Sequence, residues 1–205
     1  KMDPDKRKRK SRQIARIGDI ELFSIPGGKL TELSRFDSII VPTDGHGSPG
    51  LFLEGLYEQN PVLGEQIYNA LAIRQKSHRT LRLAENLKIN NGPLVITVIG
   101  DVHDAKDGGT SAIREATRGA LRICRSHQCK RLLFPLLSVG SGGGNANSAS
   151  SAFVQGVLKS IQEFSVMQRE LEVHICTRNM QAMKILTEMI RKEAHNSVPE
   201  APIRN

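Results

Sequence analysis

The chain has 205 residues, of which 39% are hydrophobic and 24% charged. This length and composition fit one domain of moderate size and exclude a disordered chain, a collagen-like chain and a disulfide-rich miniprotein. Because only 4% of the residues are aromatic and none is Trp, the core must be aliphatic, which disfavours a platform that stacks nucleic-acid bases. No apolar stretch reaches 18 residues and no charged-then-apolar leader opens the chain, so we expect neither a membrane span nor secretion.

The formal net charge of +8 is concentrated at the start of the chain. Residues 1–12 contain seven basic and two acidic residues, a net +5 that leaves +3 for the remainder. The basic run Lys6–Lys10 fits a solvated linker, a nuclear-import signal or an arm that contacts the phosphates of nucleic acid. We therefore expect an intracellular protein, cytoplasmic or nuclear. The chain should divide into a flexible tail over 1–16, a domain over 17–195 and a second tail over 196–205.

The three cysteines, Cys124, Cys129 and Cys176, are an odd number without the paired spacing of a metal site. We expect buried free thiols, which fits a reducing compartment. A second group of metal-ligand residue types, Asp101–Asp104, has no matching ligand group elsewhere, so a turn is expected there. The sequence therefore predicts neither a metal site nor a bound cofactor.

Short apolar runs bounded by Gly, Pro, Asn or Ser predict β-strands along the chain. They alternate with longer segments in which apolar residues recur at helical spacing. In chain order, the expected strands cover 20–25, 38–41, 80–83 (at a sheet edge), 94–99, 131–137 and 171–176. The expected helices cover 51–60, 63–74, 111–126, 153–164 and 182–192. Strands that are almost wholly apolar and alternate with helices predict an α/β sandwich, a sheet covered by helices on both faces.

In such sheets, ligands bind at the carboxyl ends of the strands, and a Gly-rich loop over 138–148 lies at one of these ends. Its glycines allow successive backbone N–H groups to converge on an anion, and the helix that follows adds its positive end. The loop lacks the Gly-Lys-Ser/Thr of a P-loop and the position of a dinucleotide fingerprint. We interpret it as a phosphate-binding loop; the alternative is a flexible connector.

A second breaker-rich loop covers 42–50 and follows another strand. Asp44 and His46 are its only ionisable residues, and beside a bound phosphate or ribose they could act as base and acid. The alternative is an Asp-Gly turn with a solvent-exposed His. A serine hydrolase is not expected, because Leu137–Gly140 does not form the Gly-x-Ser-x-Gly elbow.

The strand and loop over 131–142 read Arg-Leu-Leu-Phe-Pro-Leu-Leu-Ser-Val-Gly-Ser-Gly. They resemble the macro-domain family, in which an apolar strand with Phe-Pro leads into a loop that grips the diphosphate and distal ribose of ADP-ribose. Upstream, 36–41 is similar to the family's Asp-Ala-Ile-Val strand, and the resemblance covers the chain from 20 to about 190. It implies a three-layer α/β/α sandwich with a mixed central sheet.

The other loops depart from the family's pattern. The family's Asn-Ala-Ala-Asn stretch, whose last Asn is tied to hydrolysis, corresponds here to Pro42–Gly45. The Gly-rich loop after it reads Gly47–Gly50, with a Pro that removes an N–H donor. No carboxylate near Gly28–Lys29 replaces the acidic residue that reads adenine, and Thr177–Asn179 replaces the aromatic after the last strand.

The resemblance implies a module that binds ADP-ribose or a related nucleotide diphosphate, as a reader of ADP-ribosylation on a modified protein. Two alternatives stay open: an ADP-ribosyl hydrolase that uses Asp44 and His46, and a degenerate macro fold that binds protein or, through the basic tail, nucleic acid. The expected ligand-binding residues lie on the two loops and beyond the last strand: Val41, Thr43, Gly45, Gly47, Gly50, Ser138, Val139, Gly140, Ser141, Gly142, Gly143, Gly144 and Asn179.

Overall fold

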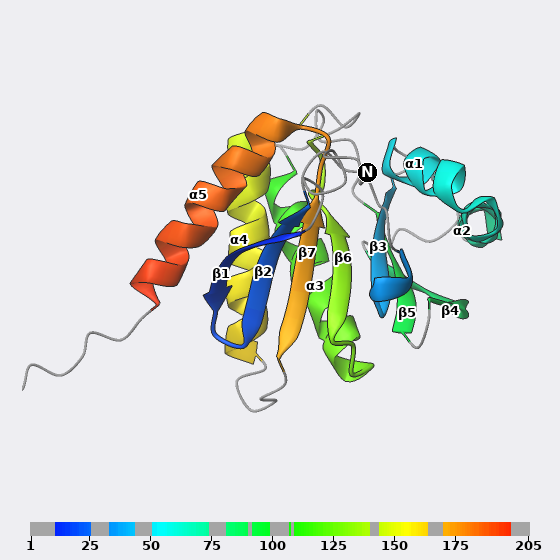
Figure 1. Ribbon diagram of the computed structural model, residues 1–205, viewed down its shortest axis with the longest axis horizontal. Coiled ribbons are helices and arrows are strands. Elements are labelled where there is room, and N and C mark those ends of the chain that lie inside the picture. Colours follow the sequence, from blue (N-terminus) through cyan, green and yellow to red (C-terminus); the bar gives the residue numbers. More distant parts are fainter. Residues whose placement is uncertain are drawn as a thin grey trace, which may run out of the picture.

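The computed structural model describes residues 11–25, 33–43, 51–73, 81–89, 92–98, 107, 109–139, 144–163 and 170–197. Within these residues, a seven-stranded sheet has the order β1-β2-β7-β6-β3-β5-β4 (Figure 1). The strands are β1 (Arg12–Ile17), β2 (Ile20–Ile25), β3 (Ser38–Thr43), β4 (Leu81–Ile89), β5 (Gly92–Val98), β6 (Arg131–Pro135) and β7 (Leu171–Cys176).

The sheet is mixed, as predicted. The inner strands β2, β7, β6, β3 and β5 are all parallel to one another. The outer strands are antiparallel, β1 against β2 and β4 against β5. The carboxyl ends of the five parallel strands therefore meet at one edge of the sheet, called the carboxyl edge below, which is the upper edge in Figure 1.

Helices cover both faces of the sheet, which confirms the three-layer sandwich. They are η3 (Leu33–Arg35), α1 (Leu51–Gln59), α2 (Pro61–Ile73), α3 (Thr110–Ser126), α4 (Ala146–Glu163) and α5 (Met180–Asn196). Apolar residues of α3, α4 and α5 form one core cluster with one face of the sheet, and those of α1 and α2 join a smaller cluster on the other face. In the described part of the chain, no helix combines the length and apolar character needed to cross a membrane.

The larger cluster holds the bulkiest fully buried side chains. Phe134 of β6 and Phe153 of α4 are 0% exposed and meet edge to face, with ring centroids 5.2 Å apart. Such a pair adds to the free energy that burial of each ring already supplies. The prediction of buried free thiols is confirmed for all three cysteines, and burial raises the pKa of Cys176 to about 12, which keeps that thiol protonated.

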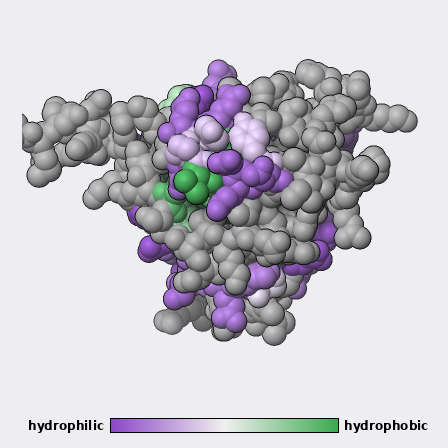
Figure 2. All heavy atoms as spheres, turned by 90° about the vertical axis from the view of Figure 1, so that its right-hand side faces the viewer, coloured by the Kyte–Doolittle hydropathy of each residue, from purple (hydrophilic) through white to green (hydrophobic). Residues whose placement is uncertain are grey.

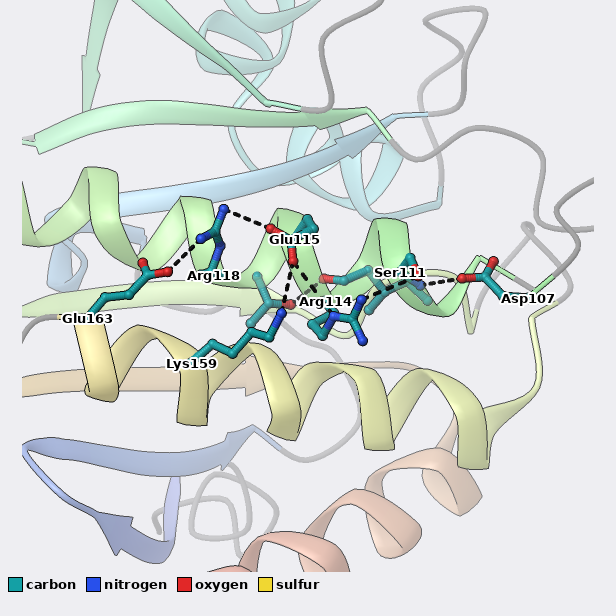
Figure 3. A network of polar contacts seen from close by, with 9 residues as sticks. Asp107, Ser111, Arg114, Glu115, Arg118, Lys159 and Glu163 are labelled. Carbon is teal, nitrogen blue, oxygen red and sulfur yellow. Dashed lines mark hydrogen bonds and ion pairs between the residues drawn. The ribbon is translucent and has the colours of Figure 1, made fainter.

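Helices α3 and α4 pack closely because a glycine lies at their contact. A Cβ atom on Gly156 would lie 2.7 Å from the Thr117 Cβ and 2.8 Å from the Arg114 carbonyl oxygen. Charged residues also form a network across the two helices (Figure 3). Glu115 pairs with Arg118 at 2.8 Å and with Lys159 at 3.4 Å.

Two sequence predictions are wrong at their boundaries. β1 occupies residues assigned to the flexible tail 1–16, because they pair with β2, and Arg16 reaches Glu170 at 2.8 Å. α4 begins at Ala146, not near 153, because the Asn145 Oδ1 accepts hydrogen bonds from the N–H groups of Asn147 and Ser148, at 2.8 and 3.2 Å. An Asn at this position favours helix initiation, so the expected loop is shorter.

Candidate functional site

Both predicted loops start at the carboxyl edge, one after β3 and the other after β6. Several predicted site residues lie outside the described residues, so their assignment stays a prediction. They are Asp44, Gly45, His46, Gly47, Gly50, Gly140, Ser141, Gly142 and Gly143. The segment 101–104, for which a turn is expected, also lies outside them.

The two ends of the Gly-rich loop lie close together. The Gly144 N–H donates a hydrogen bond to the Ser138 carbonyl oxygen at 2.8 Å. A Cβ atom on Gly144 would lie only 2.6 Å from that oxygen, so a larger residue would force the loop apart. The structure thus brings Ser138 and Gly144, both predicted site residues, into contact.

Ser138 itself has two unusual features. Its φ of 68° lies in the left-handed region, which a non-glycine residue adopts at an energetic cost and which is common at ligand-binding sites. Its Oγ is buried and has no hydrogen-bond partner within the described residues. Buried hydroxyls are normally paired; those of Ser150 and Ser160 in α4 also lack a partner within the described residues, but Ser138 combines this with a left-handed φ.

The start of α4 is less open to a ligand than its position suggests. The Asn145 side chain accepts from the N–H groups of Asn147 and Ser148, and its carbonyl accepts from Ala149 at 2.9 Å. These N–H groups are therefore not free to hold an anion. The helix still offers its positive end.

The other described site residues take structural positions. The Val41 side chain is 0% exposed and lies in the smaller core cluster, and Val139 is buried in the larger one. Any ligand contact at either position would therefore come from the main chain. Thr43 is the last residue of β3 and pairs with Val98. The Asn179 Oδ1 accepts from the Ala182 N–H at 3.0 Å and caps α5, so this side chain already has a structural role.

Arg178 is a residue at this edge that the sequence analysis did not place in the site. The Leu136 N–H donates to the Cys176 carbonyl oxygen at 2.9 Å, so the segments that follow β6 and β7 run side by side. Ser138 and Arg178 each lie two residues beyond that bond. The sequence signal that could have pointed to Arg178 was its position, shortly after an apolar strand that ends at the same edge.

His174 of β7 lies further down the sheet, away from the loops. Its ring stacks on Phe23 with centroids 4.6 Å apart and contacts the edge of Phe36. Its Nε2 lies 3.1 Å from the Glu172 Oε2. Burial lowers the pKa of His174, although Glu172 acts in the opposite direction. This environment is that of a packed, neutral ring, and we assign it no role in the site.

No protein-family model matches the chain, and the search of curated proteins returned no match. Solved structures do match it. A macrodomain of Oceanobacillus iheyensis with ADP has a TM-score of 0.72 and 16% identity, over 91% of this chain and 98% of that chain. A macrodomain of Trypanosoma brucei in complex with ADP-ribose has a TM-score of 0.61 and 15% identity, over 84% of this chain and 69% of that chain. The mixed sheet, the three layers and these similarities together show that the chain has the macrodomain fold.

Proposed function

We propose that this chain binds ADP-ribose, or a related nucleoside diphosphate, at the carboxyl edge of the sheet and reads that group on modified proteins. Two structural neighbours support the ligand class, since one was solved with ADP and the other with ADP-ribose. Their identity to this chain is low, so the support specific to this chain must come from the site itself. The observation that carries it is the buried, unpaired Ser138 hydroxyl at the start of a Gly-rich loop.

The backbone conformation of Ser138 adds to the support from its unpaired hydroxyl. A residue with φ of 68° and an unpaired buried hydroxyl combines two unfavourable features at one position. A bound diphosphate would relieve the second, because its oxygens accept a hydrogen bond from the hydroxyl. Backbone N–H groups of a Gly-rich loop can add further donors to the same anion.

The first test is isothermal titration of ADP-ribose into the purified protein, with ADP as a second ligand. We expect a dissociation constant in the micromolar range, a binding free energy of about −8 kcal/mol. Ser138→Ala should weaken binding roughly tenfold, because it removes one hydrogen bond to a charged group. No heat and no thermal shift up to about millimolar ligand, about −4 kcal/mol, would overturn the proposal.

Ser160→Ala is the matched control. Ser160 is 0% exposed, and its Oγ also has no partner within the described residues. It lies near the C-terminal end of α4, whereas the carboxyl edge lies near that helix's start. This variant removes a comparable hydroxyl and should leave the affinity unchanged. Equal losses in both variants would show a general effect on the fold and not a ligand contact.

Hydrolysis through Asp44 and His46 stays a prediction, as does nucleic-acid binding through residues 1–12. Asp44, His46 and most of that tail lie outside the described residues, so no contact favours either activity over simple binding. A cytoplasmic or nuclear location likewise stays a prediction from the run Lys6–Lys10. Release of ADP-ribose from a modified protein, lost in Asp44→Ala or His46→Ala, would add hydrolysis to the proposed function.

A further inference from the structure

Arg178 extends from the end of β7 toward α1 on the other side of β6. Its side chain is exposed, yet a Cβ atom on Gly55 of α1 would lie 3.0 Å from the Arg178 Nη2. α1 packs against β3, and β6 lies between β7 and β3 in the sheet. The guanidinium group therefore reaches across the line of β6, the strand that leads into the Gly-rich loop.

The charge of Arg178 has no partner in the described part of the chain. Some other arginines there pair with carboxylates, for example Arg125 with Asp19 at 2.6 Å and Arg131 with Glu172 at 2.9 Å. No ion pair joins Arg178 to the acidic residues of α1, although its guanidinium lies against that helix. An unpaired guanidinium held against a helix is available to an anionic group.

The two Gly-rich loops lack a positive charge of their own. Neither 42–50 nor 138–148 contains a Lys or Arg. Apart from His46 of the first loop, a diphosphate bound there would meet neutral N–H and hydroxyl donors and no Lys or Arg side chain. Arg178 lies at the same edge and carries the fork of N–H donors that matches phosphate oxygens.

We propose that Arg178 binds the diphosphate of the ligand and supplies the positive charge that the loops lack. This inference rests on the proposed function, since it concerns the same site. The inference goes beyond the proposed function because it assigns recognition of the ligand's negative charge to a residue outside both loops. Binding should then depend on the diphosphate more than on the base.

The test compares Arg178→Gln, Arg178→Lys and wild type by titration with ADP-ribose, ADP, adenosine and inorganic pyrophosphate. Arg178→Gln should weaken the three diphosphate ligands roughly ten- to hundredfold, as loss of a charge-assisted hydrogen bond does. It should leave any adenosine binding unchanged and flatten the salt dependence of ADP-ribose affinity. Arg178→Lys should keep part of the affinity, because it keeps the charge without the fork.

Arg122→Gln is the matched control for the change in net charge. Arg122 is exposed near the C-terminal end of α3, away from the carboxyl edge, and has no ion pair within the described residues. It should leave all affinities unchanged. Equal weakening by Arg122→Gln and Arg178→Gln would overturn the inference, because it would show a long-range effect of net charge.

The remaining outcomes separate the inference from the proposed function. If wild type binds ADP-ribose and Arg178→Gln binds it equally well, the inference is wrong and the proposed function stands. If Arg178→Gln weakens adenosine as much as ADP, Arg178 contacts the base and the inference is also wrong. If wild type binds pyrophosphate through Arg178 but neither ADP-ribose nor ADP, the proposed function is wrong and the inference stands. If wild type binds none of these ligands, both are wrong.

Discussion

The layer formed by α3, α4 and α5 differs from the carboxyl edge in how its polar groups are used. In the helical layer, Glu115 is shared between basic residues of two helices, and Gly156 lets those helices touch. At the edge, the Ser138 hydroxyl has no hydrogen-bond partner and the Arg178 guanidinium, which lies against Gly55, has no ion pair among the described residues. Ser160 of the layer also has a buried hydroxyl without a partner among these residues, but Ser138 combines this with a left-handed φ at the start of the Gly-rich loop. Under the proposed function, we expect the layer to supply stability and the edge to supply ligand contacts. Substitutions should therefore separate stability from binding.

The largest effect should come from the core of the helical layer. Phe153→Ala removes a fully buried ring that contacts Phe134 and should lower the free energy of unfolding by about 3–5 kcal/mol. Urea denaturation followed by circular dichroism measures this change. Phe153→Leu keeps most of the buried volume and should cost about 1.5 kcal/mol or less.

Titration of ADP-ribose into folded Phe153→Leu extends the comparison. Phe153 faces the core and not the carboxyl edge, so the affinity should equal that of wild type. A loss of affinity in this stable variant would mean that the packing of α4 sets the shape of the loop before it. The two regions would then not be separable.

Two glycine substitutions should give effects of intermediate size, one on stability and the other on affinity. Gly156→Ala brings a methyl group against Thr117 and should cost about 1–3 kcal/mol of stability without changing the affinity. Gly144→Ala places its methyl against the Ser138 carbonyl oxygen. It should open the loop and weaken ADP-ribose binding about tenfold or more, at least 1.4 kcal/mol.

Stability and affinity should both be measured for Gly156→Ala and for Gly144→Ala. Thermal denaturation reports stability, and titration reports affinity. If Gly144→Ala destabilised the protein as much as Gly156→Ala and bound ADP-ribose normally, the loop end would belong to the stable region. The contrast between the layer and the edge would then be wrong at Ser138.

Much of the fold could be predicted from the sequence because buried parallel strands are almost wholly apolar. The runs at 38–41, 94–99 and 171–176 each became a strand within a residue or two of its expected start. β1 was missed because an outer strand keeps polar residues, such as Arg12 and Arg16, that resemble a tail. Its pairing with β2 is a tertiary effect that local composition does not contain.

For the candidate site too, the sequence could indicate only what local composition contains. The Gly-rich sequence and its place after a strand predicted Ser138 and Gly144, since those signals are local. The early start of α4 was missed because Gly, Ser and Asn favour a loop, although Asn145 in fact caps the helix. Arg178 gave no comparable local signal, because its nearness to Gly55 of the distant helix α1 follows from the order of strands in the sheet.

The smallest effect should come from the exposed charge network of the helical layer (Figure 3). Glu115 lies near three basic groups, Arg114 at 3.7 Å, Arg118 at 2.8 Å and Lys159 at 3.4 Å, and its side chain is 39% exposed. Solvent screens such pairs, so Glu115→Gln should cost less than about 1 kcal/mol. The cost should shrink further between about 0.1 and 1 M salt, because the screening length falls from about 10 to 3 Å.

Glu188→Gln is the control for this smallest effect, since Glu188 is exposed on α5 and has no ion pair within the described residues. It should leave stability unchanged at both salt concentrations, as measured by urea denaturation. Neither variant should alter the affinity for ADP-ribose, because the network spans α3 and α4 and not the groups at the carboxyl edge. If Glu115→Gln changed the affinity at constant stability, charge in the helical layer would reach the ligand, and the division between the two regions would fail where it is expected to be cleanest.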